Sequence, residues 1–184
     1  MSSRKGNIVP LQALVDQMQE KIKSDYLEKY KNEWPQEEID HVAHIVAAGA
    51  IKYGMTRFDS TKKIVFDMDE WLKLDGESGP YIQYVYARIN SIISKVDQKK
   101  DVDYSLLTHQ LEKDIINQLA SFNTVVQSCV ELNKTHLLCH YLYHLAKAFN
   151  SFYAECSILK AESEPLKFAR LNIAKSVQRT IKES

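Results

Sequence analysis

Apolar residues recur every three or four positions along most of this chain, which is the spacing of one face of an α-helix. The pattern predicts a helix that starts near Pro10 and is ended or interrupted at Pro35. Further helices are predicted over residues 36–55, 80–96, 105–119, 121–132, 136–155 and 166–182, with a charged linker at 97–103. A short helix capped by Asp67 or Asp69 is expected to end near residue 74.

The chain contains little sequence that favours strands or breaks helices. Residues 62–67 are the only segment with strand character, and the segment is too short to form a sheet by itself. The chain contains only five glycines and four prolines, which favours helices over sheet. Its 184 residues suffice for one domain, or for one domain with an extension. Small side chains at residues 47–50 (A-A-G-A) permit close approach of another helix. We therefore expect an all-α protein.

The cysteines and the distribution of apolar residues suggest where the protein resides. Cys129, Cys139 and Cys156 are odd in number, widely spaced and embedded in apolar helical patterns, which is typical of reduced thiols in a cytosol. No apolar run resembles a signal peptide, and none approaches the length of a membrane span. The expectation is a soluble, cytoplasmic protein without a membrane partner.

The helix predicted over residues 80–96 has two distinct faces. Pro80 is well placed at its first turn, because a proline there gives up an amide that lacks an intrahelical partner. One face carries only apolar side chains, namely Ile82, Val85, Ile89, Ile92, Ile93 and Val96. Tyr81, Tyr84 and Arg88 line up on a neighbouring flank. Such a row can stack on an unpaired base and contact its edge or phosphate. The alternative, which the spacing alone favours, is a pair of half-buried packing tyrosines with a solvated or carboxylate-paired arginine.

Charge limits what this flank can bind. Lysine and arginine together number 24, as do aspartate and glutamate, so the formal net charge is zero. No overall field attracts polyanions, and any contact with nucleic acid must come from a local patch. A neutral chain with few phosphate contacts is expected to bind RNA weakly, with a shallow dependence on salt.

No catalytic or metal centre stands out in the sequence. His41 and His44 form an H-x-x-H pair without a third ligand or an activating glutamate. His136, His140 and His144 share one helix face, which is interpreted as a solvated face rather than a zinc site. The chain contains no glycine-rich nucleotide fingerprint, P-loop, nucleophile elbow or CxxC pair. The basic, hydroxyl-rich residues 1–9 suit either a phosphate-binding loop or a frayed terminus.

Several sequence motifs resemble one known family. They are M-S-S-R-K-G-N-I-V-P-L at residues 1–11, A-A-G-A-I-K-Y at 47–53, G-P-Y-I-Q-Y-V-Y-A-R at 79–88, H-L-L-C-H-Y-L-Y-H-L-A at 136–146, F-Y at 152–153 and A-R-L at 169–171. In this order they resemble the C-terminal third of bacterial-type arginyl-tRNA synthetases, which ends in the DALR anticodon-binding domain. The match to the family signature G-P-Y-x-Q-Y-x-x-x-R is the most specific.

The resemblance implies a fold, a division of the chain and a set of binding residues. The fold would be the helical bundle of the class I synthetase DALR type. Residues 1–34 would form a KMSKS-like loop with a connecting helix, and residues 35–184 the anticodon-binding bundle, truncated at its C-terminus. Tyr81, Tyr84 and Arg88 would contact anticodon bases, whereas Gln83 would be structural. The remnant of the ATP-binding KMSKS loop would comprise Met1, Ser2, Ser3 and Arg4.

The chain also departs from the family pattern. The catalytic Rossmann domain with its HIGH motif and the N-terminal tRNA-elbow domain are absent, and Arg4 stands where the family usually has the second lysine of the KMSKS loop. The family also continues beyond the position of Ser184, so contacts from that tail are not expected. These departures predict a chain that does not activate arginine by itself and requires no cofactor. ATP would serve only the complete family enzyme.

The leading hypothesis is a non-catalytic α-helical domain that binds the anticodon loop of tRNA, most simply an arginine tRNA, and not DNA. One alternative is a protein-interaction bundle that docks on a synthetase or another partner without binding tRNA. A second alternative is a fragment of a complete arginine–tRNA ligase.

Overall fold

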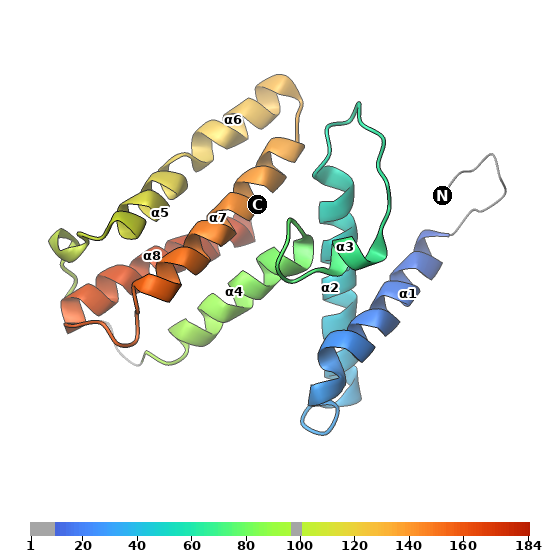
Figure 1. Cartoon of the computed structure of the whole chain (residues 1–184), viewed down its shortest axis with the longest axis horizontal. Helices are drawn as coiled ribbons and strands as arrows, with labels where there is room; N and C mark the ends of the chain where they lie inside the picture. Colours follow the sequence, from blue (N-terminus) through green and yellow to red (C-terminus); the bar gives the residue numbers. More distant parts are fainter. Residues whose placement is uncertain (1–9, 97–100) are drawn as a thin grey trace. The chain divides into compact units, whose positions relative to one another are not determined.

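The computed structural model describes residues 10–96 and 101–184, and all regular elements in these ranges are helices (Figure 1). Their contacts divide the chain into two compact units, the first ending at Gln83 and the second comprising Tyr84–Ser184. Helix α4 (Gly79–Ile93) contains the boundary between them. The prediction of an all-α fold is confirmed over the described residues. Residues 97–100 of the predicted linker lie outside them.

Two helices side by side dominate the first unit (Figure 1). Helix α1 (Leu11–Ile22) continues into a π-helical turn, η2 (Lys23–Leu27), and a 3₁₀ turn, η3 (Glu28–Tyr30), before α2 (Gln36–Thr56) begins after Pro35. The core between them consists of Leu14, Met18, Ile22, Leu27, Ile39, Ala43, Ala47 and Ala50, joined by Trp71 and Leu72. Both predicted helices are present, and α2 begins directly after Pro35, but the first α-helix ends at Ile22, well before that proline.

The small residues of α2 allow a very close helix contact. A methyl group added at Gly79 would overlap the backbone carbonyl of Gly49, and one added at Gly49 would overlap the side chain of Gln83. Gln83 occupies this space and donates from Nε2 to the carbonyl oxygen of Ile45 at 3.1 Å. The predicted close approach to the small-residue run is confirmed, and its partner is the first turn of α4.

The segment before α4 has no regular structure except one short helix. Residues 63–67 form neither strand nor helix, and Phe66 packs edge-on against Trp71 with ring centroids 4.8 Å apart. Asp67 caps α3 (Met68–Leu72), because its carboxylate accepts the backbone N–H of Glu70 at 3.1 Å. The cap is confirmed, although α3 ends at Leu72 rather than near residue 74.

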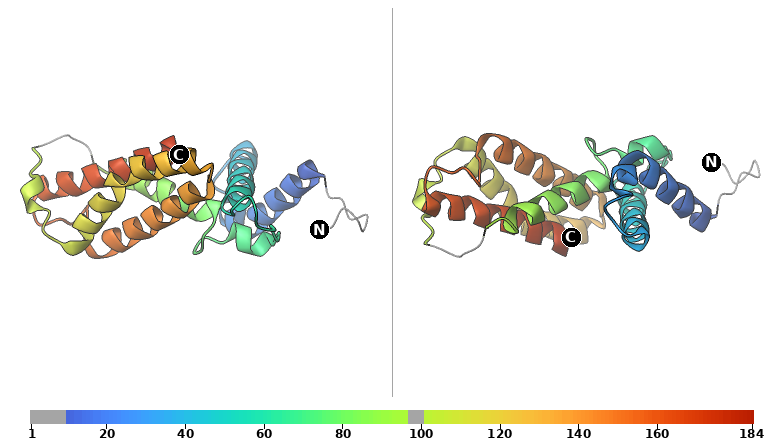
Figure 2. Two further views of the ribbon diagram at one scale, coloured as in Figure 1. Left: turned by 90° about the horizontal axis from the view of Figure 1, so that it is seen from above. Right: turned by 90° about the horizontal axis from the view of Figure 1, so that it is seen from below.

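Four helices and one short turn make up most of the second unit. They are η4 (Tyr104–Leu106), α5 (Gln110–Ala120), α6 (Phe122–Leu132), α7 (His136–Glu155) and α8 (Glu164–Glu183). Helix α7 contacts α5, α6 and α8. Figure 2 shows these helices from above and from below, with α7 in orange and α8 in red. The most buried apolar side chains of this unit are Val85, Ile89, Ile115, Leu145, Ala146, Phe149, Phe152, Ile158, Ala169, Ala174 and Val177.

Two helix starts in this unit differ from prediction because of local capping. Helix α5 begins at Gln110 rather than residue 105, since His109 and Glu112 form a reciprocal capping box. Helix α8 begins two residues early, at Glu164, because the Ser163 hydroxyl accepts the N–H of Leu166 at 3.4 Å. Thr135 occupies the N-cap position of α7 as predicted, but its side chain makes no capping hydrogen bond.

A buried ion pair joins α5 to α8. Arg170 Nε lies 2.6 Å from Glu112 Oε1, and the exposed fractions of the two side chains are 15% and 0%. The second carboxylate oxygen of Glu112 accepts the backbone N–H of His109 at 2.9 Å, and Arg170 Nη1 donates to the carbonyl of Ser157 at 3.0 Å. These added hydrogen bonds are what a buried charge pair needs to be tolerated.

The cysteines and the helix lengths complete the fold. All three cysteines are free thiols, as predicted, and burial raises the pKa of Cys156. In residues 10–96 and 101–184 we find no helix with the length and apolar character needed to traverse a bilayer.

Candidate nucleic-acid interface

Helix α4 presents the two faces predicted from its sequence. The helix begins at Gly79, where the hydroxyl of buried Ser78 accepts the backbone N–H of Tyr81 at 3.2 Å. Its apolar face is buried, with Ile82, Val85, Ile89 and Ile92 all in the core. The flank with Tyr81, Tyr84 and Arg88 is where a ligand contact is predicted.

Arg88 is held by two neutral groups within the second unit. Its Nη2 donates to the hydroxyl oxygen of Tyr84 at 2.6 Å, and its Nη1 donates to Oδ1 of Asn150 on α7 at 2.7 Å. The guanidinium carbon lies 4.7 Å from the centroid of the Tyr84 ring. Tyr84 is 44% exposed, whereas Arg88 and Asn150 are half-buried. An aromatic ring and an oriented cation therefore meet at an accessible position.

Tyr81 differs from Tyr84 although it lies only one turn away. Its side chain is buried, with 9% exposed, and it belongs to the first unit. Base stacking requires an open ring face, so direct stacking on Tyr81 would require the ring to become exposed. The structure thus brings Tyr84 and Arg88 into contact and leaves Tyr81 among core residues.

Asn150 is a member of this group that the sequence analysis missed. Hydrogen bonds between helices far apart in sequence depend on the tertiary fold, and Asn150 lies 62 positions after Arg88. The sequence of α7 alone does not mark Asn150 as a binding residue. Asn150 directly follows the buried residue Phe149, and one residue separates it from the buried residue Phe152.

The histidines do not assemble a metal site in the described part of the chain. The rings of His136 and His140 meet edge-on with centroids 5.9 Å apart. Across residues 10–96 and 101–184, no three or more histidine, cysteine or acidic side chains gather closely enough to hold a metal ion.

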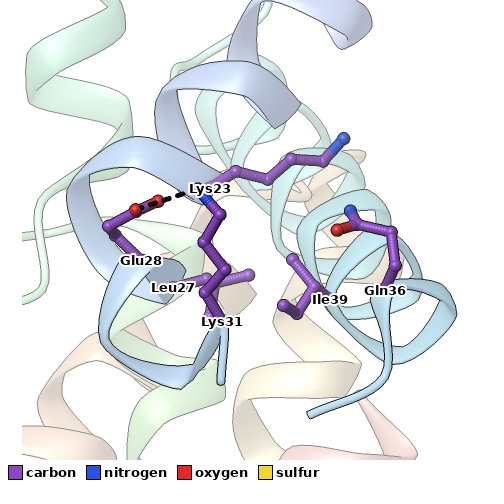
Figure 3. Close-up of a pocket in the computed structure, with 6 residues that line it drawn as sticks. All are labelled: Lys23, Leu27, Glu28, Lys31, Gln36 and Ile39. Atoms are coloured by element: carbon purple, nitrogen blue, oxygen red, sulfur yellow. Dashed lines mark hydrogen bonds and ion pairs between the residues drawn. The ribbon is translucent and has the colours of Figure 1, made fainter. Parts of the chain in front are cut away.

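Two cavities have linings that include neither Tyr84 nor Arg88. One, of about 180 Å³, is lined by residues of η2, η3 and α2 (Figure 3). Its lysines already have acidic partners: Lys31 lies 3.1 Å from Glu28, and the amine of Lys23 points away from that pair toward Asp40, 2.7 Å distant.

The second cavity, of about 350 Å³, is lined by residues of α5, α6 and α7, together with Ser121 at the junction of α5 and α6. Tyr141 at its edge donates its hydroxyl to the carbonyl of Gln118 at 3.0 Å, and burial raises the pKa of Tyr141 to about 12. Its hydroxyl groups on Ser121, Ser128 and Tyr141 all donate to backbone carbonyls. No charged residue lines this second cavity, and the charged residues that line the first are paired with one another or with Asp40.

Met1, Ser2, Ser3 and Arg4, predicted as a remnant of an ATP-binding loop, lie outside the described residues.

Comparison with known proteins identifies the family of this chain. The model of the DALR anticodon binding domain matches residues 82–184, which include Tyr84, Arg88 and Asn150. The chain therefore belongs to the DALR anticodon binding domain family. The predicted resemblance to this family and the predicted bundle type are both confirmed.

The relatives of this chain are arginine–tRNA ligases. It is 50% identical to arginine–tRNA ligase of Bdellovibrio bacteriovorus over 184 residues, covering 99% of this chain and 32% of the relative. It is 38% identical to that of Clostridium botulinum, again covering 99% of this chain and 32% of the relative. The arginyl-tRNA synthetase of Thermus thermophilus matches with a TM-score of 0.88 at 28% identity, over 98% of this chain and 30% of that one. The chain thus spans about a third of the length of the relatives it matches.

Proposed function

We propose that this chain binds the anticodon loop of a tRNA, and that the tRNA is one that accepts arginine. An unpaired base stacks on Tyr84, and Arg88 contacts a base edge or a phosphate. The observation that carries the proposal is the contact between an exposed tyrosine and an arginine held by neutral groups, within the residues matched by an anticodon-binding family. The names of the relatives supply the choice of arginine tRNA.

Physical chemistry supports this choice of residues. Single-stranded RNA loops are recognised by stacking of unpaired bases on aromatic rings and by hydrogen bonds from planar guanidinium groups. Because the formal net charge is zero, oriented local groups must supply the affinity that a basic surface would otherwise provide. Tyr81 is proposed as a supporting residue of the same helix rather than as the main stacking platform, because its ring is buried.

The proposal for this chain is restricted to binding. Ligation of arginine to tRNA is what the names of the full-length relatives describe. The division into residues 1–34 and 35–184 and the ATP-loop role of Met1, Ser2, Ser3 and Arg4 belong to that larger activity, and we propose them only for the complete ligase.

The test is binding of a fluorescently labelled anticodon stem-loop of an arginine tRNA, followed by anisotropy at fixed low salt. Tyr84→Ala should weaken binding about fivefold or more, since stacking on an aromatic ring contributes about 1–3 kcal/mol per base. Arg88→Ala should weaken it about as much, and should lower the slope of log affinity against log salt by about 0.7 if the contact is to phosphate.

Two matched variants control for general effects. Tyr104→Ala removes another exposed tyrosine, on η4, and Arg179→Ala removes an exposed arginine on α8. Both should bind like the unaltered protein. If Arg179→Ala weakens binding as much as Arg88→Ala, the interaction is one of bulk charge. If the unaltered protein binds no stem-loop, the proposal fails and a protein-interaction bundle becomes the better hypothesis.

A further inference from the structure

We propose that Asn150 is a positioning residue for RNA binding, which holds the guanidinium of Arg88 against Tyr84 without neutralising its charge. This inference rests on the proposed anticodon-loop function, and it assigns to α7 a part in RNA binding that the proposed function gives to residues of α4. Asn150 need not touch the RNA in this role.

The first step is geometric. The guanidinium of Arg88 is fixed at two points, by Asn150 Oδ1 at 2.7 Å and by the Tyr84 hydroxyl at 2.6 Å. A planar group bound at both terminal nitrogens has its plane defined, and it lies 4.7 Å from the ring centroid of Tyr84. An unrestrained arginine loses much rotamer freedom when a ligand orders it, so prior fixation raises affinity.

The second step concerns the donors that remain. A guanidinium carries five N–H donors in a fixed fork. The bonds to Asn150 and Tyr84 use one donor on each terminal nitrogen. Further donors in the same plane are therefore available for the edge of a base or for a phosphate.

The third step is electrostatic. Arg170 and Arg179 each lie within 3 Å of a glutamate oxygen, at 2.6 and 2.7 Å. Arg88 has instead an amide and a phenol as its side-chain partners. A carboxylate in place of Asn150 would hold the guanidinium equally well, but it would cancel the charge that attracts RNA. A neutral acceptor orients the cation and leaves its charge for the ligand.

The competing explanation is that the bond merely joins α4 to α7. Asn90 provides a matched control, because it is an exposed asparagine on α4 whose Oδ1 accepts a hydrogen bond from Gln178 of α8 at 3.4 Å. If the Asn150 bond were purely structural, Asn150→Ala and Asn90→Ala should change RNA binding by similar factors. The effect of Asn150→Ala should then not depend on the presence of Arg88.

The experiment is a double-mutant cycle with the labelled anticodon stem-loop, using the unaltered protein, Asn150→Ala, Arg88→Ala and the double variant. We expect Asn150→Ala to weaken binding about threefold to tenfold and the double variant to bind no more weakly than Arg88→Ala. Asn90→Ala should bind like the unaltered protein. Melting curves confirm that each variant is folded at the temperature of the assay.

A second variant keeps the inference testable if Asn150→Ala does not fold. Asn150→Asp retains the acceptor, so it should fold, yet bind the stem-loop more weakly and with a shallower salt dependence. If Asn150→Asp bound the stem-loop as tightly as the unaltered protein, the claim that a neutral acceptor is needed to preserve the charge of Arg88 would be overturned.

The outcomes separate this inference from the function on which it rests. If Asn150→Ala binds normally while Tyr84→Ala and Arg88→Ala are weakened, the inference fails and the proposed function stands. If Asn150→Ala weakens binding by the same factor with and without Arg88, Asn150 acts independently of that arginine and the inference is overturned. If the unaltered protein fails to bind, the proposed function itself has failed.

Discussion

Two arginines of the second unit link helices in very different ways. Arg170 pairs with a carboxylate that is completely buried, and both groups make further hydrogen bonds to the backbone. Arg88 is held by the neutral side chains of Asn150 and Tyr84, and nearly half of the Tyr84 side chain is exposed. We call these the Arg170 region, comprising His109, Glu112, Ser157 and Arg170, and the Arg88 region, comprising Tyr84, Arg88 and Asn150.

This difference indicates that Arg170 stabilises the fold, whereas Arg88 is suited to bind a ligand. A buried ion pair is satisfied internally, and removing one partner leaves an uncompensated charge in a medium of low polarity. An arginine with neutral partners beside an exposed ring keeps its charge and part of its hydrogen-bonding capacity for another molecule. Stability should therefore depend on the Arg170 region, and RNA affinity on the Arg88 region.

The largest expected effect is on stability in the Arg170 region. Glu112→Ala should lower the free energy of unfolding by about 3–5 kcal/mol, because it leaves Arg170 partly buried without its counter-charge and removes the Glu112 half of the capping box of α5. Urea denaturation followed by circular dichroism measures this change. Glu183→Ala, which removes the exposed partner of Arg179, is the control and should leave stability unchanged within error. A Glu112→Ala protein as stable as this control would remove the distinction between the two regions.

A smaller effect on stability is expected in the Arg88 region. Arg88→Ala removes hydrogen bonds to two partly exposed neutral groups, so the free energy of unfolding should fall by about 1 kcal/mol. The same urea titration provides the value. A loss as large as that of Glu112→Ala would show that Arg88 is chiefly a structural residue, and its effect on RNA affinity would then need another explanation.

Much of the helical framework was predictable because it depends on local patterns. The buried positions of α4 follow from a spacing of three and four residues, and the Asp67 cap and the start of α2 directly after Pro35 follow from local backbone chemistry. The start of α5 was missed because its capping residue is His109, which is not among the usual N-cap residues. Local sequence rules describe the common caps and cannot identify an uncommon one.

The candidate site was only partly predictable for a related reason. Helical spacing places Tyr81, Tyr84 and Arg88 along one flank, but exposure depends on which side chains pack over each position. Tyr81 is therefore buried while Tyr84 is open, a difference that the spacing does not contain. The partnerships of Arg88 with Asn150 and of Arg170 with Glu112 join distant helices, so they required the tertiary structure.

The most direct measurement compares the two arginines in one experiment. Side-chain Nε–H signals of Arg88 and Arg170, assigned by nuclear magnetic resonance, can be followed while an unlabelled anticodon stem-loop of an arginine tRNA is added. We expect the Arg88 signal to shift in a saturable way and the Arg170 signal to stay in place, because only the first arginine meets the RNA. Saturable binding without movement of the Arg88 signal, or with an equal shift at Arg170, would contradict the assignment of the interface to the Arg88 region.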